Sequence, residues 1–144
     1  AHRISDRAYE QLTGIPGAFS TRLLYVVAQN IATEAETFRL EIADADGANA
    51  QTLLKSREPI LSASWSPDGQ TVVYVSFETG KPAIYLQEIA TGRREKLTDF
   101  EGLNGSPVFS PDGKQLALVL SAGGNPDIFV LDLETRKLRQ RVVG

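Results

Sequence analysis

The stretch Ser64-Trp65-Ser66-Pro67-Asp68-Gly69 decides the fold, because its pattern returns forty-four residues later as Val108-Phe109-Ser110-Pro111-Asp112-Gly113. A strand-like run of apolar residues follows each copy. A repeat of about 40–45 residues made of short strands is typical of a β-propeller blade. The sequence therefore predicts an all-β fold, a partial β-propeller built from antiparallel blades.

The repeated stretch has the chemistry of a tight turn. Pro67 presets the backbone for the second position of a type I turn, and Gly69 accepts the positive φ that the exit of such a hairpin requires. Asp68 and its repeat Asp112 could instead be catalytic or metal-binding carboxylates. The turn already explains an aspartate at both positions, so we interpret both residues as turn residues.

The strand pattern predicts three blades, at about 20–56, 59–98 and 103–144, with four strands in each of the last two. The first blade is expected to lack its innermost strand, since no aromatic-Ser-Pro-Asp-Gly segment precedes it. Residues 1–19 are expected to be a short helix and a linker from a missing upstream domain. Ile4, Ala8 and Leu12 recur at helical spacing over residues 3–13, and Gly14 is a suitable helix end.

Composition excludes several classes of function. The net charge of −3 offers no basic face for nucleic acid, and no apolar run reaches the roughly 18 residues that would insert into a membrane. His2 is the sole histidine and there is no Cys, which argues against a Ser-His-Asp triad, thiol chemistry or a histidine-rich metal site. The absence of Met indicates a chain that begins inside a longer protein or a processed form.

No cofactor is predicted. The segment Asp44-x-Asp46-Gly47 resembles the start of a calcium-binding loop, but the twelfth position, where such a loop needs a glutamate, is Lys55. We interpret the segment as a hairpin turn. Asn104-Gly105-Ser106 matches the N-glycosylation pattern, yet Asn-Gly is equally a turn signal, and the turn is the interpretation we favour.

Two loops are the candidates for binding. Residues 56–60 and 100–105 lead into the innermost strands of the second and third blades, so they open on the same face of the propeller. They combine apolar Ile60, Leu61 and Leu103 with polar Glu58, Glu101 and Asn104, a mixture suited to a protein or peptide partner. The alternative is that they are ordinary loop tips.

Three segments carry a resemblance to a known family. The run Tyr9–Arg22, the stretch Ala63–Gly69 and the stretch Asn104–Gly113 resemble the TolB family of the bacterial Tol–Pal envelope system, and the match covers nearly the whole chain. The resemblance implies a periplasmic, non-enzymatic protein with an α/β domain and a six-bladed propeller. It implies binding of the peptidoglycan-associated lipoprotein Pal, binding of TolA through the missing N-terminal region, and possible binding of colicin-type peptides.

The resemblance also implies which residues contact Pal. They lie in the two loops already described: Glu58, Pro59, Ile60, Leu61 and Ser62, then Leu103, Asn104, Gly105 and Ser106. In the family the last strand of the chain returns to complete the first blade, which would account for the missing inner strand.

Two other interpretations stay open. The chain could be the propeller portion of a prolyl-oligopeptidase-type peptidase whose catalytic domain lies elsewhere, or a half-propeller without retained activity. An open set of blades leaves apolar flanks uncovered, so we also expect the chain to self-associate.

Overall fold

The computed structural model describes residues 8–14, 22–102, 104–121 and 124–140, and these residues form three antiparallel sheets of four strands each. The first sheet holds β1 (Ala8–Gly14), β2 (Arg22–Gln29), β3 (Thr37–Asp44) and β4 (Gln51–Ser56). The middle sheet holds β5 (Ile60–Trp65), β6 (Thr71–Ser76), β7 (Ala83–Glu88) and β8 (Arg94–Thr98). The third sheet holds β9 (Asn104–Phe109), β10 (Gln115–Leu120), β11 (Asp127–Asp132) and β12 (Leu138–Gln140).

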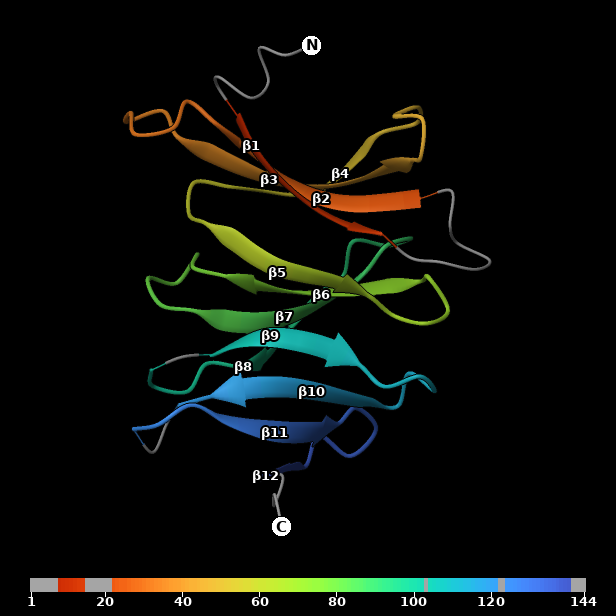
Figure 1. Ribbon diagram of the computed structural model, residues 1–144, viewed down its shortest axis with the longest axis vertical. Coiled ribbons are helices and arrows are strands. Elements are labelled where there is room, and N and C mark those ends of the chain that lie inside the picture. Colours follow the sequence, from red (N-terminus) through yellow and green to blue (C-terminus); the bar gives the residue numbers. More distant parts are fainter. Residues whose placement is uncertain (1–7, 15–21, 103, 122–123, 141–144) are drawn as a thin grey trace.

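The sheets follow one another along the longest axis of the molecule, with the first at the top and the third at the bottom of Figure 1. Within each sheet the strand order follows the chain, so each is a simple meander. The first strands of the middle and third sheets, β5 and β9, lie beside one another. This is the arrangement of propeller blades, and the predicted all-β partial propeller is confirmed.

The repeated turns form as predicted. In the first copy Gly69 has φ of 72° and its N–H donates to the Ser66 carbonyl at 3.0 Å, while the Ser66 hydroxyl donates to Asp68 at 2.6 Å. The second copy repeats the geometry, with Gly113 at φ of 74°. Hydrogen bonding, first from Ser66, lowers the pKa of Asp68, so the charged carboxylate holds the turn closed.

The N-terminal segment differs from the prediction. Residues 8–13, expected in a helix, belong to strand β1, which pairs with β2 from Ala8 opposite Gln29 to Gly14 opposite Leu23. The first sheet therefore has its fourth strand, and the expected gap is wrong. The spacing of four residues between Ala8 and Leu12 fits a helix. It fits a strand as well, because residues an even number of positions apart lie on the same face of a strand. Pairing with β1 satisfies backbone hydrogen-bonding groups of β2. Propensities taken from the local sequence do not include this contribution, because the two strands meet only in the folded chain. Residues 3–7 lie outside the described residues.

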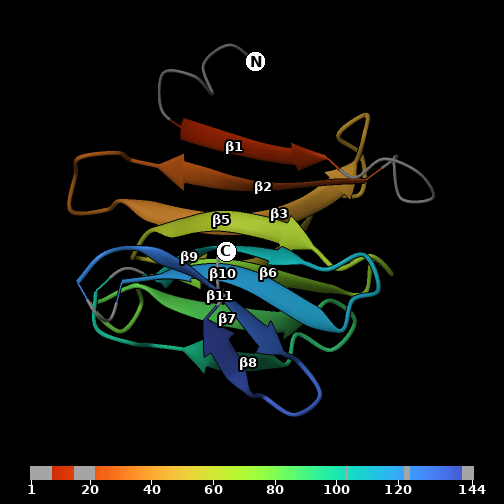
Figure 2. The same ribbon diagram turned by 60° about the horizontal axis from the view of Figure 1, so that its bottom comes forward.

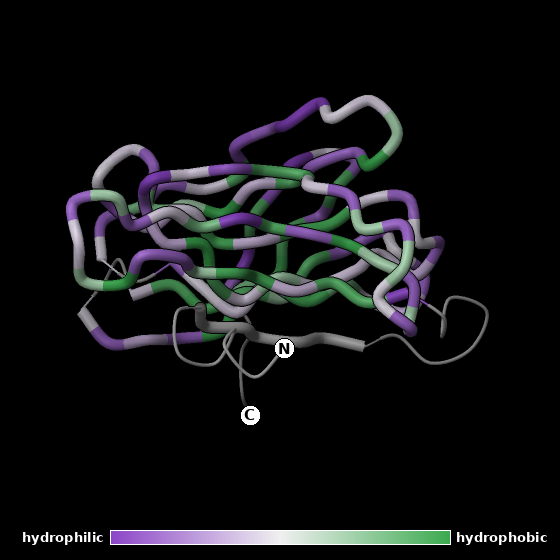
Figure 3. The backbone as a smooth tube through the Cα atoms, turned by 90° about the horizontal axis from the view of Figure 1, so that it is seen from above, coloured by the Kyte–Doolittle hydropathy of each residue, from purple (hydrophilic) through white to green (hydrophobic). Residues whose placement is uncertain are grey.

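Two apolar clusters join the sheets. Side chains alternate along each strand, so the middle sheet buries one face against the first sheet and the other against the third. Tyr74 and Trp65 belong to the first cluster, whereas Val73 and Leu118 belong to the second. Figure 3 shows the hydrophobic residues along the strands in the middle of the molecule and the hydrophilic ones mostly in the loops at either end.

A buried polar link crosses the first cluster. The Tyr74 hydroxyl donates to Gln87 Oε1 at 2.7 Å and accepts from Arg94 Nε at 2.8 Å. Gln87 in turn donates through Nε2 to the Leu53 carbonyl of the first sheet at 2.8 Å. Burial raises the pKa of Tyr74 to about 12, which keeps its hydroxyl protonated and able to donate.

Candidate partner-binding face

The two predicted binding loops leave the sheets at one end of the molecule. Each connects the outermost strand of one sheet to the first strand of the next, β4 to β5 and β8 to β9. The Ser-Pro-Asp-Gly turns lie at the opposite end, because they follow β5 and β9 rather than precede them. The fold therefore separates the repeated turns from the candidate site.

The first segment is fixed by backbone contacts at both of its ends. The Glu58 N–H donates to the Ser56 hydroxyl at 2.9 Å, and the Pro59 carbonyl accepts from the Phe77 N–H at 3.1 Å. Ile60 then enters β5 and is only 1% exposed. Leu61, the next residue along the strand, points to the other side and is 38% exposed. Of these two predicted residues, only Leu61 has a side chain that a partner can reach.

The second segment is organised by a buried amide. Asn104, 1% exposed, accepts from the Phe100 N–H at 3.1 Å and donates to the carbonyls of Phe100 at 2.6 Å and Gly102 at 3.2 Å. Its side chain therefore ties Phe100 and Gly102 to the first residue of β9. Asn104 lies in strand β9, so the favoured turn at Asn104-Gly105 is wrong. Leu103 lies outside the described residues.

Both inner strands carry a bulge at the same place. Ser62 has φ of 55° and Ser106 has φ of 51°, and the pairing register shifts around each of them. The two serines are related by the forty-four-residue repeat. A positive φ is costly for a residue with a side chain, and such geometry survives only where the surrounding structure imposes it. Sequence reasoning singled out both serines but did not predict the bulges.

The exposed groups on this face come from neighbouring loops. Phe100 is 43% exposed, and Glu58 and Glu101 are exposed as well. Lys81, from the loop between β6 and β7, approaches Glu101 at 3.5 Å and ties that loop to the one before β9. Sequence reasoning missed Lys81, since nothing in its local sequence shows that the two loops meet. Gly105 is buried and Ser106 is exposed.

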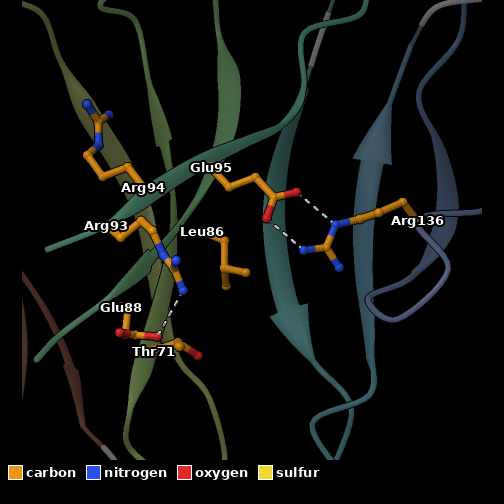
Figure 4. A pocket seen from close by; sticks show the side chains of 7 residues that line it. All are labelled: Thr71, Leu86, Glu88, Arg93, Arg94, Glu95 and Arg136. Carbon is orange, nitrogen blue, oxygen red and sulfur yellow. Dashed lines mark hydrogen bonds and ion pairs between the residues drawn. The ribbon is translucent and has the colours of Figure 1, made fainter. Parts of the chain in front are cut away.

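A hollow of about 410 Å³ lies at the outer side of the middle and third sheets (Figure 4). Four of its five charged side chains form ion pairs with one another, and the fifth, Arg94, pairs with Glu78 outside the hollow. Arg136 donates to both carboxylate oxygens of Glu95, at 2.8 and 2.7 Å, and thereby connects the two sheets. Arg93 lies 3.9 Å from Glu88. The hydrogen bond from Arg136 lowers the pKa of Glu95.

The described residues contain no group of three or more His, Cys, Asp or Glu side chains that could hold a metal ion. In the suspected calcium segment, Asp46 accepts from the Ala48 N–H at 2.9 Å and Asp44 accepts from the Asn49 amide at 2.8 Å. Both carboxylates thus accept hydrogen bonds within the turn between β3 and β4. His2 lies outside the described residues. Within the described part of the chain, no helix is long and apolar enough to cross a membrane.

The geometry described above is that of β-propeller blades, and comparison with known proteins agrees with it. A model of the TolB β-propeller domain matches residues 9–143. The chain is 56% identical over 125 residues to the Tol-Pal system protein TolB of Alcanivorax borkumensis, covering 86% of this chain and 28% of that protein. The crystal structure of TolB from Acinetobacter baumannii is similar with a TM-score of 0.80 and 54% identity, over 90% of this chain and 32% of that one.

The chain belongs to the TolB β-propeller family. It spans about a quarter of the length of the curated relatives it matches. The acylaminoacyl peptidase of Pyrococcus horikoshii is also similar, with a TM-score of 0.73 over 97% of this chain and 25% of that chain. Its sequence identity is only 13%, so this likeness shows the fold alone.

Proposed function

We propose that this chain is part of a non-catalytic protein-interaction scaffold of the Tol–Pal cell-envelope system, working in the periplasm. The family match and the names of its close relatives support this role. The proposed partner is the lipoprotein Pal. TolA, reached through a region outside this chain, and colicin-type peptides are further proposed partners of the whole protein.

The observation that carries the Pal proposal is the pair of fixed loops at one end of the sheets. Exposed Leu61 and Phe100 supply apolar contact area, and Glu58 and Glu101 supply charge around it. Partly exposed apolar side chains with a polar rim are the usual composition of a protein-binding surface. Asn104 acts as a positioning residue, because its buried amide holds Phe100 in place.

Calorimetric titration of the chain with the soluble domain of Pal tests the proposal. We expect saturable binding that a Leu61→Ala/Phe100→Ala variant weakens at least tenfold, since apolar anchors dominate such interfaces. Ile128→Ala is the matched control, because Ile128 is 45% exposed on a different surface. Equal loss of binding in both variants, or no loss in either, would contradict the assignment of the face.

The propeller portion of a peptidase remains the alternative class. At 13% identity the likeness to a peptidase shows the fold alone and does not favour that class over the scaffold. A catalytic serine elbow in the remainder of the parent protein would favour that alternative over the scaffold.

A further inference from the structure

The loop between β2 and β3, residues 30–36, lies at the end of the molecule that holds the two candidate binding loops. β2 ends and β3 begins at this end, as β4 ends and β5 begins there. Figure 1 and Figure 2 both show the loop on the same side of the sheets as the segments before β5 and β9. A direct contact ties it to the first candidate loop, because Arg57 Nη2 donates to the Glu34 carbonyl at 3.0 Å. The three loops therefore share one face.

Loop 30–36 is held in a backbone conformation that is unfavourable for its residues. Asn30 has φ of 56° and Ala32 has φ of 65°. The corresponding loops of the middle and third sheets place glycines in the positive-φ region instead, Gly80 and Gly124. Hydrogen bonds within the first loop impose its conformation, since Thr33 donates to the Asn30 carbonyl through Oγ1 at 2.6 Å and through its N–H at 3.1 Å. Backbone strain that the surrounding contacts maintain points to a function for the segment.

This conformation presents an apolar side chain to solvent. Ile31, between the two positive-φ residues, is 47% exposed. Of the five exposed large apolar side chains in the described part of the chain, three lie on this face: Ile31, Leu61 and Phe100. A single exposed isoleucine on a surface needs no explanation, but an isoleucine that a strained loop holds in solvent does. Ile31 therefore adds an apolar side chain from the first sheet to the two already proposed as partner contacts.

The loops around Ile31 and Leu61 carry an excess of negative charge. Ion pairs neutralise three other carboxylates of this face: Glu78 with Arg94, Asp99 with Lys96, and Glu101 with Lys81. The carboxylates of Glu34, Glu36 and Glu58 form no ion pair with any described residue. Arg57 is the only cation in residues 30–36 and 57–59, the two segments that hold them. The described loops at the opposite end of the sheets carry equal numbers of carboxylates and cations, so the excess belongs to this face.

We propose that loop 30–36 is a third contact element of the partner-binding face, with Ile31 as its apolar anchor, and that this face selects a protein surface carrying lysine or arginine around an apolar centre. Charge complementarity sets the chemistry of the partner, because unpaired carboxylates beside exposed apolar side chains attract cations to the rim of the contact and leave its centre apolar. The inference rests on the proposed function and takes the soluble domain of Pal as the occupant. That partner then contacts the first sheet as well as the loops that lead into β5 and β9.

Calorimetric titration of the chain with the soluble domain of Pal, together with stopped-flow association kinetics, tests the proposal. We expect Ile31→Ala to raise the dissociation constant about fivefold or more, because it removes an apolar anchor. The matched control is Ile128→Ala, the same change at a 45% exposed position on a different surface, which should leave the dissociation constant unchanged. Glu34→Gln should lower the association rate constant about twofold at low salt and weaken its dependence on ionic strength. Glu134→Gln, the same change in a loop at the opposite end, should do neither.

The outcomes separate this inference from the proposed function. Circular dichroism of each variant checks that it is folded. If Ile31→Ala binds as tightly as the unaltered chain while Leu61→Ala/Phe100→Ala binds more weakly, this inference is overturned and the proposed function stands. Association that does not slow as salt is added would overturn the selection of a basic partner surface. No binding by the unaltered chain would overturn both the inference and Pal as the partner.

Discussion

At the scale of single residues, two serines in β5 differ in backbone conformation, and therefore in the side chains that their positions tolerate. Ser62 has a positive φ of 55°, whereas Ser64, two residues further along the same strand, is not among the residues with positive φ. Both side chains are half-buried. A β-branched side chain is disfavoured in the left-handed region but suits a regular strand. The two positions should therefore respond differently to the same substitution.

We expect Ser62→Val to lower the free energy of unfolding by about 1–3 kcal/mol, because valine strains the left-handed backbone. Ser64→Val should change it by no more than about 0.5 kcal/mol, as for an ordinary half-buried strand position. Urea denaturation of both variants measures the difference. Equal effects would show that the bulge does not impose the conformation.

Tyr74 gives a second prediction at this scale. Its pKa is raised to about 12 by burial, so the hydroxyl stabilises the fold fully below the unfolded pKa near 10 and loses that contribution as the pH rises through 12. Burial raises the pKa of Tyr85 as well, so both phenols should ionise late in an ultraviolet titration, and Tyr74→Phe should remove the step near 12. Tyr74→Phe should also cost about 1–3 kcal/mol, since Gln87 Oε1 then lacks its donor. Tyr85→Phe is the matched control.

At the scale of elements, the sheets are joined by polar links as well as apolar clusters. The Glu95–Arg136 pair connects β8 to the turn between β11 and β12 through two hydrogen bonds. Both side chains are roughly half exposed, at 48% and 41%. Solvent screens such a pair, so it adds less than about 1 kcal/mol to stability.

The pair predicts a pH effect. The pKa of Glu95 is lowered below 4.5 in the folded state, so the pair stabilises above that pH and the stabilisation disappears as the pH falls through the folded pKa. We expect Glu95→Gln to lower the melting temperature slightly at neutral pH and to match the parent chain in strong acid. Glu134→Gln, an exposed substitution in the turn before Arg136, is the control. A constant difference at all pH values would contradict the assignment.

At the scale of the whole molecule, the middle sheet takes part in both apolar clusters. Loss of either cluster therefore removes support from the same four strands. Trp65, the single tryptophan, belongs to the first cluster, and its fluorescence reports on that side of the middle sheet. Leu118 lies in the second cluster and is 1% exposed.

We expect Leu118→Ala to cost about 2–5 kcal/mol and to move the Trp65 transition and the circular dichroism transition together in urea. Val108→Ala, at a 55% exposed position in the same sheet, should have little effect. A Trp65 transition that stays in place while the circular dichroism transition shifts would mean that the sheets unfold separately.

The sequence by itself determined the strands from β2 to β12 and the turns between them, apart from the turn expected at Asn104-Gly105, which lies in β9. Alternating apolar residues and the Ser-Pro-Asp-Gly turns act within a few residues, so the local sequence contains their physical cause. The repeat also placed the two candidate loops at equivalent positions. Local reasoning could not assign β1, because the spacing of Ala8 and Leu12 suits a helix and a strand equally, and only pairing with β2 decides between them.

The tertiary structure decided which of the predicted site residues a partner can reach. Ile60 and Leu61 are adjacent and both apolar, yet one is buried and the other exposed, because the neighbouring sheet covers one side of β5. The amide of Asn104 folds back onto its own loop instead of facing solvent. The outer face of the third sheet has the same cause: Ile128 is 45% exposed, whereas Ile84, forty-four residues earlier, is buried against the third sheet, since burial depends on neighbours distant in the chain.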